Sequence, residues 1–435
     1  MNSGRQSPVV GKNIGLVIYY AVLAILTLLM MRPEVEEYPL AIRMVYLGLV
    51  FAPLVYAKEF TPFAVTAFYT ISYCSFVGLL PFSIVYPFAA LLFLWLLTRV
   101  KIHIPAIYII ALSYFFVVSL LYFDFEETGV LWIGILMIMI LSAYIRTEKE
   151  LSLFAYGFVL VSFILGMVFL LNIEHFMYAY THTAEDFDRS GWLNPNVFGG
   201  TIGCGTVIAT NLILDGKKKS ILLRLFLLAT IVISFITLAM NASRGALIAT
   251  ALGSILFVIL NKKMSITGKL LIIAASGVLI YILYKYSFLD LLVKRFQEEF
   301  DEESGGGRFL IWSKKLDLFA EMSPIKHLFG IGQIECIDLG RHIRTHNDFL
   351  TAYIAYGIVG VVFFIILLFR PFYSNFSFKK FFAILPYMVF LLTECFLLEP
   401  LMRGYFVFIA FFLFINKYCS LYFDKDAKKT MTNGR

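Results

Sequence analysis

The chain has 435 residues, of which 60% are apolar and only 15% charged, whereas soluble domains are about 45–50% apolar and about 25% charged. A water-soluble fold of this length could not bury so much apolar surface, but a bilayer accommodates it, because each spanning helix satisfies its own backbone hydrogen bonds. The formal charge of +7 does not indicate nucleic-acid binding, because Lys and Arg occur in short clusters between apolar runs, as membrane topology signals do.

Apolar stretches long enough to cross a bilayer recur along the chain. Each has about 16–23 residues, close to the span that a hydrocarbon core requires. They lie at residues 14–31, 39–56, 61–80, 82–98, 104–123, 130–145, 151–172, 196–215, 221–240, 245–260, 269–286, 347–369, 381–398 and 403–418. This pattern predicts an all-α fold, a polytopic membrane helix bundle of about 14 (12–14) transmembrane helices with a long, partly helical extracytoplasmic loop. The boundary between the third and fourth stretches is the least clearly marked in the sequence.

Positive charges occupy alternate loops, which is typical of loops that remain in the cytoplasm. They are Lys58; Arg99 and Lys101; Arg146 and Lys149; Lys217 to Lys219; Lys262 and Lys263; Arg370, Lys379 and Lys380; and Lys425, Lys428 and Lys429. We therefore expect both termini in the cytoplasm and the two longest polar segments, 173–195 and 287–346, on the outer side. Five of the six histidines fall in these two segments.

The same features divide the chain into three parts. We expect residues 1–150 to hold N-terminal transmembrane helices and residues 151–369 to form a core that includes both outer segments. Residues 370–435 would hold the C-terminal transmembrane helices and a cytoplasmic tail.

Polar residues interrupt the apolar pattern at four places on the predicted outer side. The first interruption runs from Arg189 into Asn194-Pro195-Asn196. Proline fixes φ and asparagine caps free backbone groups, so this turn is typical of a helix start. Helix capping alone would explain it about as well as a role in a site.

The second and third interruptions each contain one arginine. The second runs from Asn241 to Ala246 and contains Arg244, whose side chain could simply extend to the membrane interface. The third is the glycine run 305–307 followed by Arg308, which could be a linker and a surface arginine. Apolar residues then recur at helical spacing, at Phe309, Trp312, Leu316 and Phe319. This amphipathic piece could roof a cavity on the membrane surface or only cover neighbouring helices.

The fourth interruption begins at Arg341 and contains Arg344, His346 and Asn347. A histidine at a membrane boundary is costly unless it has a partner or a function. Asn347 could also serve only as a helix cap.

The four interruptions together predict several arginines and one histidine around one mouth of the bundle, with Arg403 as a further outward charge. Such a mouth suits a diphosphate, because arginine is always charged and can bind phosphate oxygens through two parallel hydrogen bonds. Histidine changes its charge near neutral pH and can take a proton from an attacking hydroxyl.

The order of these motifs resembles that of the bacterial O-antigen polymerase and ligase superfamily. The motifs are Arg-x-Gly-x-x-Asn-Pro-Asn, Ser-Arg-Gly-Ala, Gly-Arg-x-x-x-Trp, Gly-x-Gly at 330–332, and His-Asn-x-Phe-Leu followed by Gly-x-x-Gly. The resemblance covers about residues 151–369. The first part of the chain is similar to the superfamily only in its apolar spans.

The resemblance implies a glycosyltransferase on the outer face of the bacterial cytoplasmic (inner) membrane, with a polyprenyl-diphosphate-linked glycan as donor. The reducing-end sugar of the donor would pass to an acceptor hydroxyl, and the lipid diphosphate would be released. By this analogy Arg189, Arg244 and Arg308 bind the diphosphate and stabilise its growing negative charge, and His346 activates or positions the acceptor. The substrate-binding candidates are Arg244, Asn194, Asn196, Arg341, Arg344, Asn347 and Arg403.

Three acceptors remain open within this resemblance. A polymerase uses another lipid-linked repeat unit, a ligase uses lipid A core and so completes lipopolysaccharide, and a third class uses a protein hydroxyl. A sizeable extra outer domain that would suit a protein acceptor is not evident. The Asn-Pro-Asn and His-Asn-x-Phe-Leu forms favour a polymerase for a surface polysaccharide, whether O-antigen, capsule or exopolysaccharide.

The alternative from another class is a membrane transporter. Transporters often place charges or broken helices near the bilayer midplane, whereas the arginines here are at one surface. Glu394 is the main ionisable residue within a span, and a hydrogen-bonded role in the bundle is the favoured interpretation of it.

We expect no cofactor and no metal. The chain has no Gly-x-x-x-x-Gly-Lys-Ser/Thr loop, and Asp186-Phe187-Asp188 is better explained as a solvated loop than as a metal-binding Asp-x-Asp motif. The expected partners are the lipid bilayer, the lipid-linked donor and the glycan acceptor. A flippase and a chain-length regulator are candidate protein partners, and nucleic acid is not.

Overall fold

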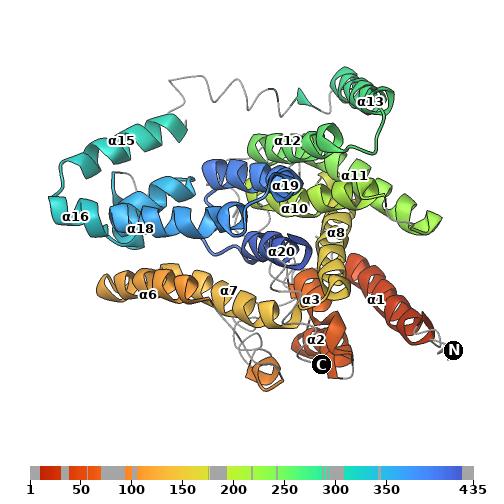
Figure 1. Ribbon diagram of the computed structural model, residues 1–435, viewed down its shortest axis with the longest axis horizontal. Helices are drawn as coiled ribbons and strands as arrows, with labels where there is room; N and C mark the ends of the chain where they lie inside the picture. Colours follow the sequence, from red (N-terminus) through yellow and green to blue (C-terminus); the bar gives the residue numbers. More distant parts are fainter. Residues whose placement is uncertain are drawn as a thin grey trace.

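The computed structural model is helical throughout its described part. It describes residues 10–30, 39–55, 57–69, 94–99, 105–174, 176, 194–216, 219–241, 243–286, 289–290, 293, 308–340 and 344–423. All regular elements in these ranges are helices (Figure 1). The predicted all-α class is therefore confirmed.

Among the described residues, six helices are long and apolar enough to cross a membrane. They are α8 (Glu148–Leu171), α10 (Pro195–Leu214), α11 (Ile221–Met240), α18 (Asp348–Tyr373), α19 (Phe378–Leu397) and α20 (Phe406–Phe423). Shorter apolar segments lie in α1 (Val10–Met30), α2 (Leu40–Phe51), α6 (Ala106–Leu121), α7 (Phe125–Tyr144), α12 (Arg244–Leu260) and α13 (Ile266–Lys285). Each overlaps a predicted span, whereas most of the predicted stretch 82–98 lies outside the described residues. The protein is thus a polytopic helical membrane protein.

Helix α10 lies at the centre of the bundle. Its most apolar window is 78% buried, against 28% for α11, so α10 contacts mainly protein. Glycines permit this close packing, because a Cβ on Gly205 would lie 2.1 Å from the carbonyl oxygen of Phe158 on α8. A Cβ on Gly203 would lie 2.5 Å from Oγ1 of Thr250 on α12. Small residues at such positions let helix backbones approach one another.

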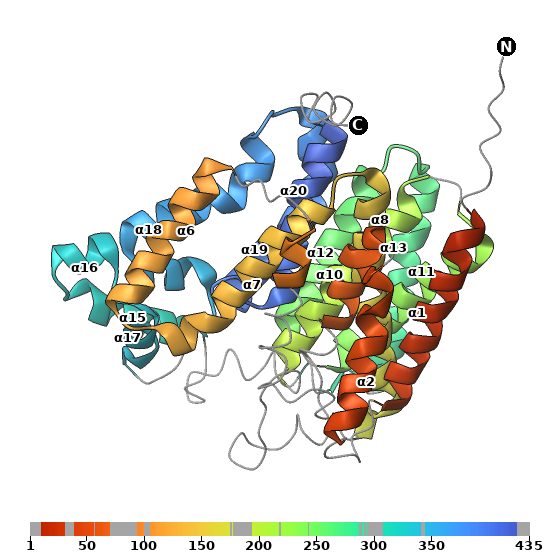
Figure 2. The same ribbon diagram turned by 90° about the horizontal axis from the view of Figure 1, so that it is seen from below.

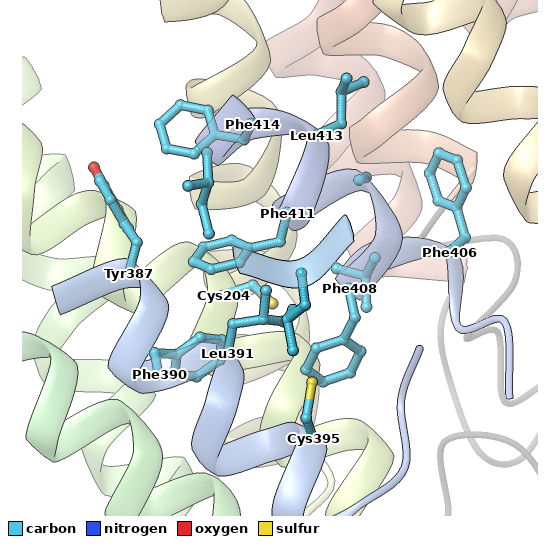
Figure 3. Packing of buried hydrophobic residues seen from close by; sticks show 14 of the residues in the cluster. Cys204, Tyr387, Phe390, Leu391, Cys395, Phe406, Phe408, Phe411, Leu413 and Phe414 are labelled. Carbon is cyan, nitrogen blue, oxygen red and sulfur yellow. The ribbon is translucent and has the colours of Figure 1, made fainter. Parts of the chain in front are cut away.

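An aromatic cluster joins α19 to α20. Figure 3 shows Phe390 of α19 beside Phe411 of α20, and their ring centroids are 5.2 Å apart. Tyr387 and Phe414 pack edge to face at 5.3 Å. Edge-to-face rings are favourable beyond their burial, so the cluster holds together the helices whose ends carry the site.

Helix α18 is not the continuous span that the sequence predicted at 347–369. Its chain breaks at Gly357, which has φ 69°. The glycine loop 330–332 packs into the break, where the N–H groups of Ile331 and Gly332 donate to the carbonyls of Ile354 and Ala355 at 3.0 and 2.9 Å. The loop therefore supplies the hydrogen bonds that the broken helix lacks.

Three short helices follow one another on one side of the molecule (Figure 2): α15 (Arg308–Ala320), α16 (Pro324–Phe329) and α17 (Gln333–Asp338). The amphipathic pattern predicted a helix over residues 309–319, and α15 confirms it.

Candidate functional site

The site is built around His346, which precedes α18. Its Nδ1 atom lies 3.2 Å from Nη2 of Arg403, and its backbone N–H donates to Oε2 of Glu399 at 3.1 Å. Because a guanidinium can only donate, Nδ1 is the acceptor, and the proton of the neutral ring is on Nε2. The imidazole can therefore offer an N–H group to a ligand.

Glu399 connects this histidine to the surrounding polypeptide. The residue is 3% exposed, and its Oε1 accepts a hydrogen bond from the hydroxyl of Thr351 at 2.6 Å. Its Oε2 lies 3.7 Å from Nε of Arg403. One buried carboxylate thus contacts both the backbone of His346 and the guanidinium that binds the imidazole.

The first turn of α18 fixes the loop that carries Glu399 and Arg403. The carboxylate of Asp348 accepts the backbone N–H groups of Met402 at 2.8 Å and Leu401 at 3.1 Å. Asn347 caps the same helix, since its Oδ1 accepts the N–H of Leu350 at 3.0 Å. Capping, which the sequence left open for Asn347, is therefore its role in the fold.

Helix α15 is held so that Arg308, at its start, lies near this centre. The indole N–H of Trp312 donates to the carbonyl of Thr345, beside His346, at 2.7 Å. The ammonium of Lys315, buried at 2% exposure, binds three carbonyls at the end of α17. These are Cys336, Ile337 and Leu339, at 2.5, 3.0 and 2.9 Å.

The electrostatic environment keeps His346 neutral. Burial, and then the positive charge of Arg403, lower the pKa of His346 from 6.5 to about 3. Arg308 and Arg344 act in the same direction. Positive charge around a neutral imidazole favours an anionic ligand, and binding of such a ligand would raise this pKa again by offsetting the arginine charges.

A second polar cluster joins the start of α10 to the turn between α11 and α12. Oδ1 of Asn194 accepts the N–H of Asn196 at 3.0 Å, as a helix cap does. The hydroxyl of Ser243 donates to Oδ1 of Asn196 at 3.1 Å, and the amide of Asn241 donates to the carbonyl of Pro195 at 2.6 Å. Arg244, directly after Ser243, begins α12.

Glu394 on α19 lies between the two clusters. The residue is 1% exposed, and a Cβ on Gly200 of α10 would lie 3.1 Å from its Oε2. Arg308 acts electrostatically on Glu394 as well as on His346. Within the described residues Oε1 of Glu394 has no hydrogen-bond partner, and the hydrogen-bonded role expected from the sequence stays a prediction.

The structure brings four of the predicted residues together, namely His346, Arg403, Arg308 and Arg344. Asn194, Asn196 and Arg244 belong to the second cluster. Arg189 and Arg341 lie outside the described residues.

Sequence reasoning missed Glu399. A signal for Glu399 was present, because Glu399-Pro400 interrupts two apolar spans four residues before Arg403. The described residues contain no group of three or more His, Cys, Asp and Glu that could hold a metal ion.

These features define a polytopic helical membrane protein in which a neutral imidazole and several arginines meet at one end of the bundle. Residues 229–365 match the family model described as O-antigen ligase. This match supports the resemblance to the O-antigen ligase and polymerase superfamily, and the matched range includes Arg244, Arg308 and His346. Neither a curated protein nor a solved structure gives a match.

Proposed function

We propose that this protein is a membrane glycosyltransferase that polymerises polyprenyl-diphosphate-linked oligosaccharide repeat units of a surface polysaccharide. The observation that carries the proposal is the neutral imidazole of His346, hydrogen-bonded to Arg403 and within the field of Arg308 and Arg344. Such a group of cations can bind a diphosphate and stabilise the negative charge that develops on it as it leaves.

The reaction would be a displacement at the first sugar of the donor. An acceptor hydroxyl attacks C1 of that sugar, the bond from C1 to the phosphate oxygen breaks, and the lipid diphosphate departs with the bonding electrons. The arginines offset its charge. The hydroxyl proton passes to a base in the site and from there to solvent or the released diphosphate.

The proposed role of His346 depends on Arg403. While Nδ1 accepts the hydrogen bond of Arg403, the ring can only donate through Nε2–H and so position a substrate. If the guanidinium turns to a bound diphosphate, Nδ1 becomes free and its pKa rises, so the ring can then accept the hydroxyl proton. Donor binding would thereby prepare the base.

The site would face outward across the cytoplasmic membrane. The positive-inside rule assigns the Lys- and Arg-rich loops to the cytoplasm. The helix ends that carry the site lie opposite these loops; they are the starts of α10, α12, α18 and α20 and the ends of α11 and α19. No nucleotide sugar is available on that outer side, so a lipid-linked donor suits the location.

The second candidate is an O-antigen ligase that transfers the lipid-linked glycan to lipid A core. The description of the matching family model favours it. The two candidates share donor and chemistry and differ only in the acceptor.

The decisive experiment supplies purified protein in detergent with lipid-diphosphate-linked repeat units alone, and separately with added lipid A core. Longer products from repeat units alone would support the polymerase. Products only when lipid A core is present would establish the ligase. No product in either mixture, with transport of lipid-linked glycan by reconstituted vesicles, would overturn the enzyme and favour a transporter.

Two variants test the site itself. We expect Arg308→Ala and His346→Ala to abolish glycan elongation while membrane insertion persists, because losing one such electrostatic group commonly costs about 10²–10³ in rate. Normal polymer length in both variants would refute the site assignment.

A further inference from the structure

A cavity of about 550 Å³ extends from Leu401 and Met402, in the loop that carries Arg403, to Arg370 and Lys417 near the ends of α18 and α20. It is lined mainly by α6, α7, α18 and α20, and Figure 1 shows α6 and α7 running along one side of α18 and α20. Its volume is in the usual range of small-molecule and cofactor sites.

The wall of this cavity is mostly hydrocarbon, supplied by all four helices. Representative lining residues are Leu112, Phe115, Ile135, Ile138, Leu367 and Phe412. On α20 the lining extends from Ile409 to Ser420, a rise of about 16 Å along a helix. An elongated apolar chain would fit this shape.

One end of the cavity carries two cations, Arg370 near the end of α18 and Lys417 near the end of α20. No Asp or Glu is among the described residues that line it. The Nη1 atom of Arg370 is buried and has no hydrogen-bond partner in the described chain, and Lys417 likewise makes no ion pair there. Buried charges are normally paired, and although Glu150 acts electrostatically on Lys417, no carboxylate among the described residues lines the cavity beside the two cations.

The surroundings of Arg370 hold it at the cavity. Its guanidinium lies over the ring of Tyr108, 4.8 Å from the centroid, and the Tyr108 hydroxyl donates to Oδ1 of Asn416 at 3.1 Å. Tyr108, Asn416 and Ser374 all line the cavity. Polar groups thus cluster beside the two cations, and the apolar wall begins next to them.

We propose that this cavity binds an anionic phospholipid, with its phosphate at Arg370 and Lys417 and an acyl chain along the apolar wall. Charge complementarity identifies the occupant, because a phosphodiester neutralises the two cations and only a hydrocarbon chain suits the rest of the cavity. The tail of a donor held at His346 would place no anion at this end. This inference does not require the proposed enzymatic activity.

The test is native mass spectrometry of the full chain in detergent with phosphatidylglycerol, phosphatidylcholine or inorganic phosphate. We expect phosphatidylglycerol to bind about tenfold or more tighter than phosphatidylcholine, and the preference to fall to about twofold or less in the double variant R370Q/K417Q. The matched control is K58Q/K262Q, which removes two exposed lysines and should keep the preference.

A second variant keeps the proposal testable if R370Q/K417Q does not fold. Leu112→Trp keeps both cations but places a larger side chain in the apolar part of the cavity, and it should weaken phosphatidylglycerol binding as well. Equal binding of the two lipids to the unmodified protein, or a preference that survives in R370Q/K417Q, would overturn the proposal. So would tight binding of inorganic phosphate that phosphatidylglycerol cannot displace.

Discussion

The backbone N–H of His346 donates to the carboxylate of Glu399 at 3.1 Å, and both residues have left-handed backbones, with φ 52° and 67°. Such a conformation costs a non-glycine residue about 1–3 kcal/mol, and it persists only where surrounding contacts enforce it. Here Asp348 holds the loop after Glu399, and Trp312 holds the residue before His346. The strain therefore lies where the proposed chemistry takes place.

Glu399→Gln should lower the turnover rate by about 10–100-fold with little change in the donor KM. The amide keeps the size of the side chain but loses the charge that aligns Arg403, so Glu399 acts as a positioning residue. The measurement is initial rate against donor concentration, together with the pH profile of kcat, which should shift. Glu335→Gln, at an exposed carboxylate 3.8 Å from Lys326, is the control. Equal kinetics for the two variants would contradict a positioning role.

Arg403→Lys should retain the fold and yet lose activity by about 10²–10³-fold. A lysine ammonium keeps the positive charge, but it lacks the planar guanidinium with several N–H donors that can contact the imidazole and a phosphate together. Rates and thermal unfolding should be measured on the same preparation. A lysine variant with full activity would show that only the charge matters.

Stability should fall on the acid side because of His346. Its pKa is lowered from 6.5 to about 3 in the folded state. Above pH 6.5 both states are neutral at this residue, but as the pH falls from 6.5 towards 3 only the unfolded state takes up the proton, so the folded state is progressively destabilised.

The check on this pH effect is His346→Gln, which removes the titrating group. Its midpoint of thermal unfolding in detergent should decline less between pH 6.5 and pH 5 than that of the unmodified protein. Parallel declines would show that another group is responsible.

Gly357→Ala should destabilise the fold by more than about 1 kcal/mol, because φ at this position is 69° and a Cβ would lie 2.3 Å from the carbonyl oxygen of Leu328. Gly277→Ala in α13 is the matched control, since no atom lies within 4 Å of its Cβ, and alanine there should be neutral or slightly stabilising. Thermal unfolding of both variants in detergent gives the comparison. Similar midpoints would mean that the break in α18 tolerates a side chain.

Hydropathy predicted the helices closely because a spanning segment must satisfy its backbone internally and present apolar side chains, both of which are properties of local sequence. The predicted stretch 221–240 coincides with α11, and 151–172 differs from α8 by only a few residues. The break at Gly357 escaped prediction, because its hydrogen bonds come from residues 330–332, and a hydropathy window does not detect such a distant partner.

The sequence by itself determined the membrane class, the positions of the helices and the set of arginines and histidine from which a site could be built. Only the tertiary structure decided which of them meet, because His346 and Arg403 are 57 residues apart and their contact depends on how α18, α19 and α20 pack. It also revealed Glu399 between them and the pairing of Asn196 with Ser243. Composition and periodicity report the environment of each segment, whereas contacts between loops depend on packing that no single segment encodes.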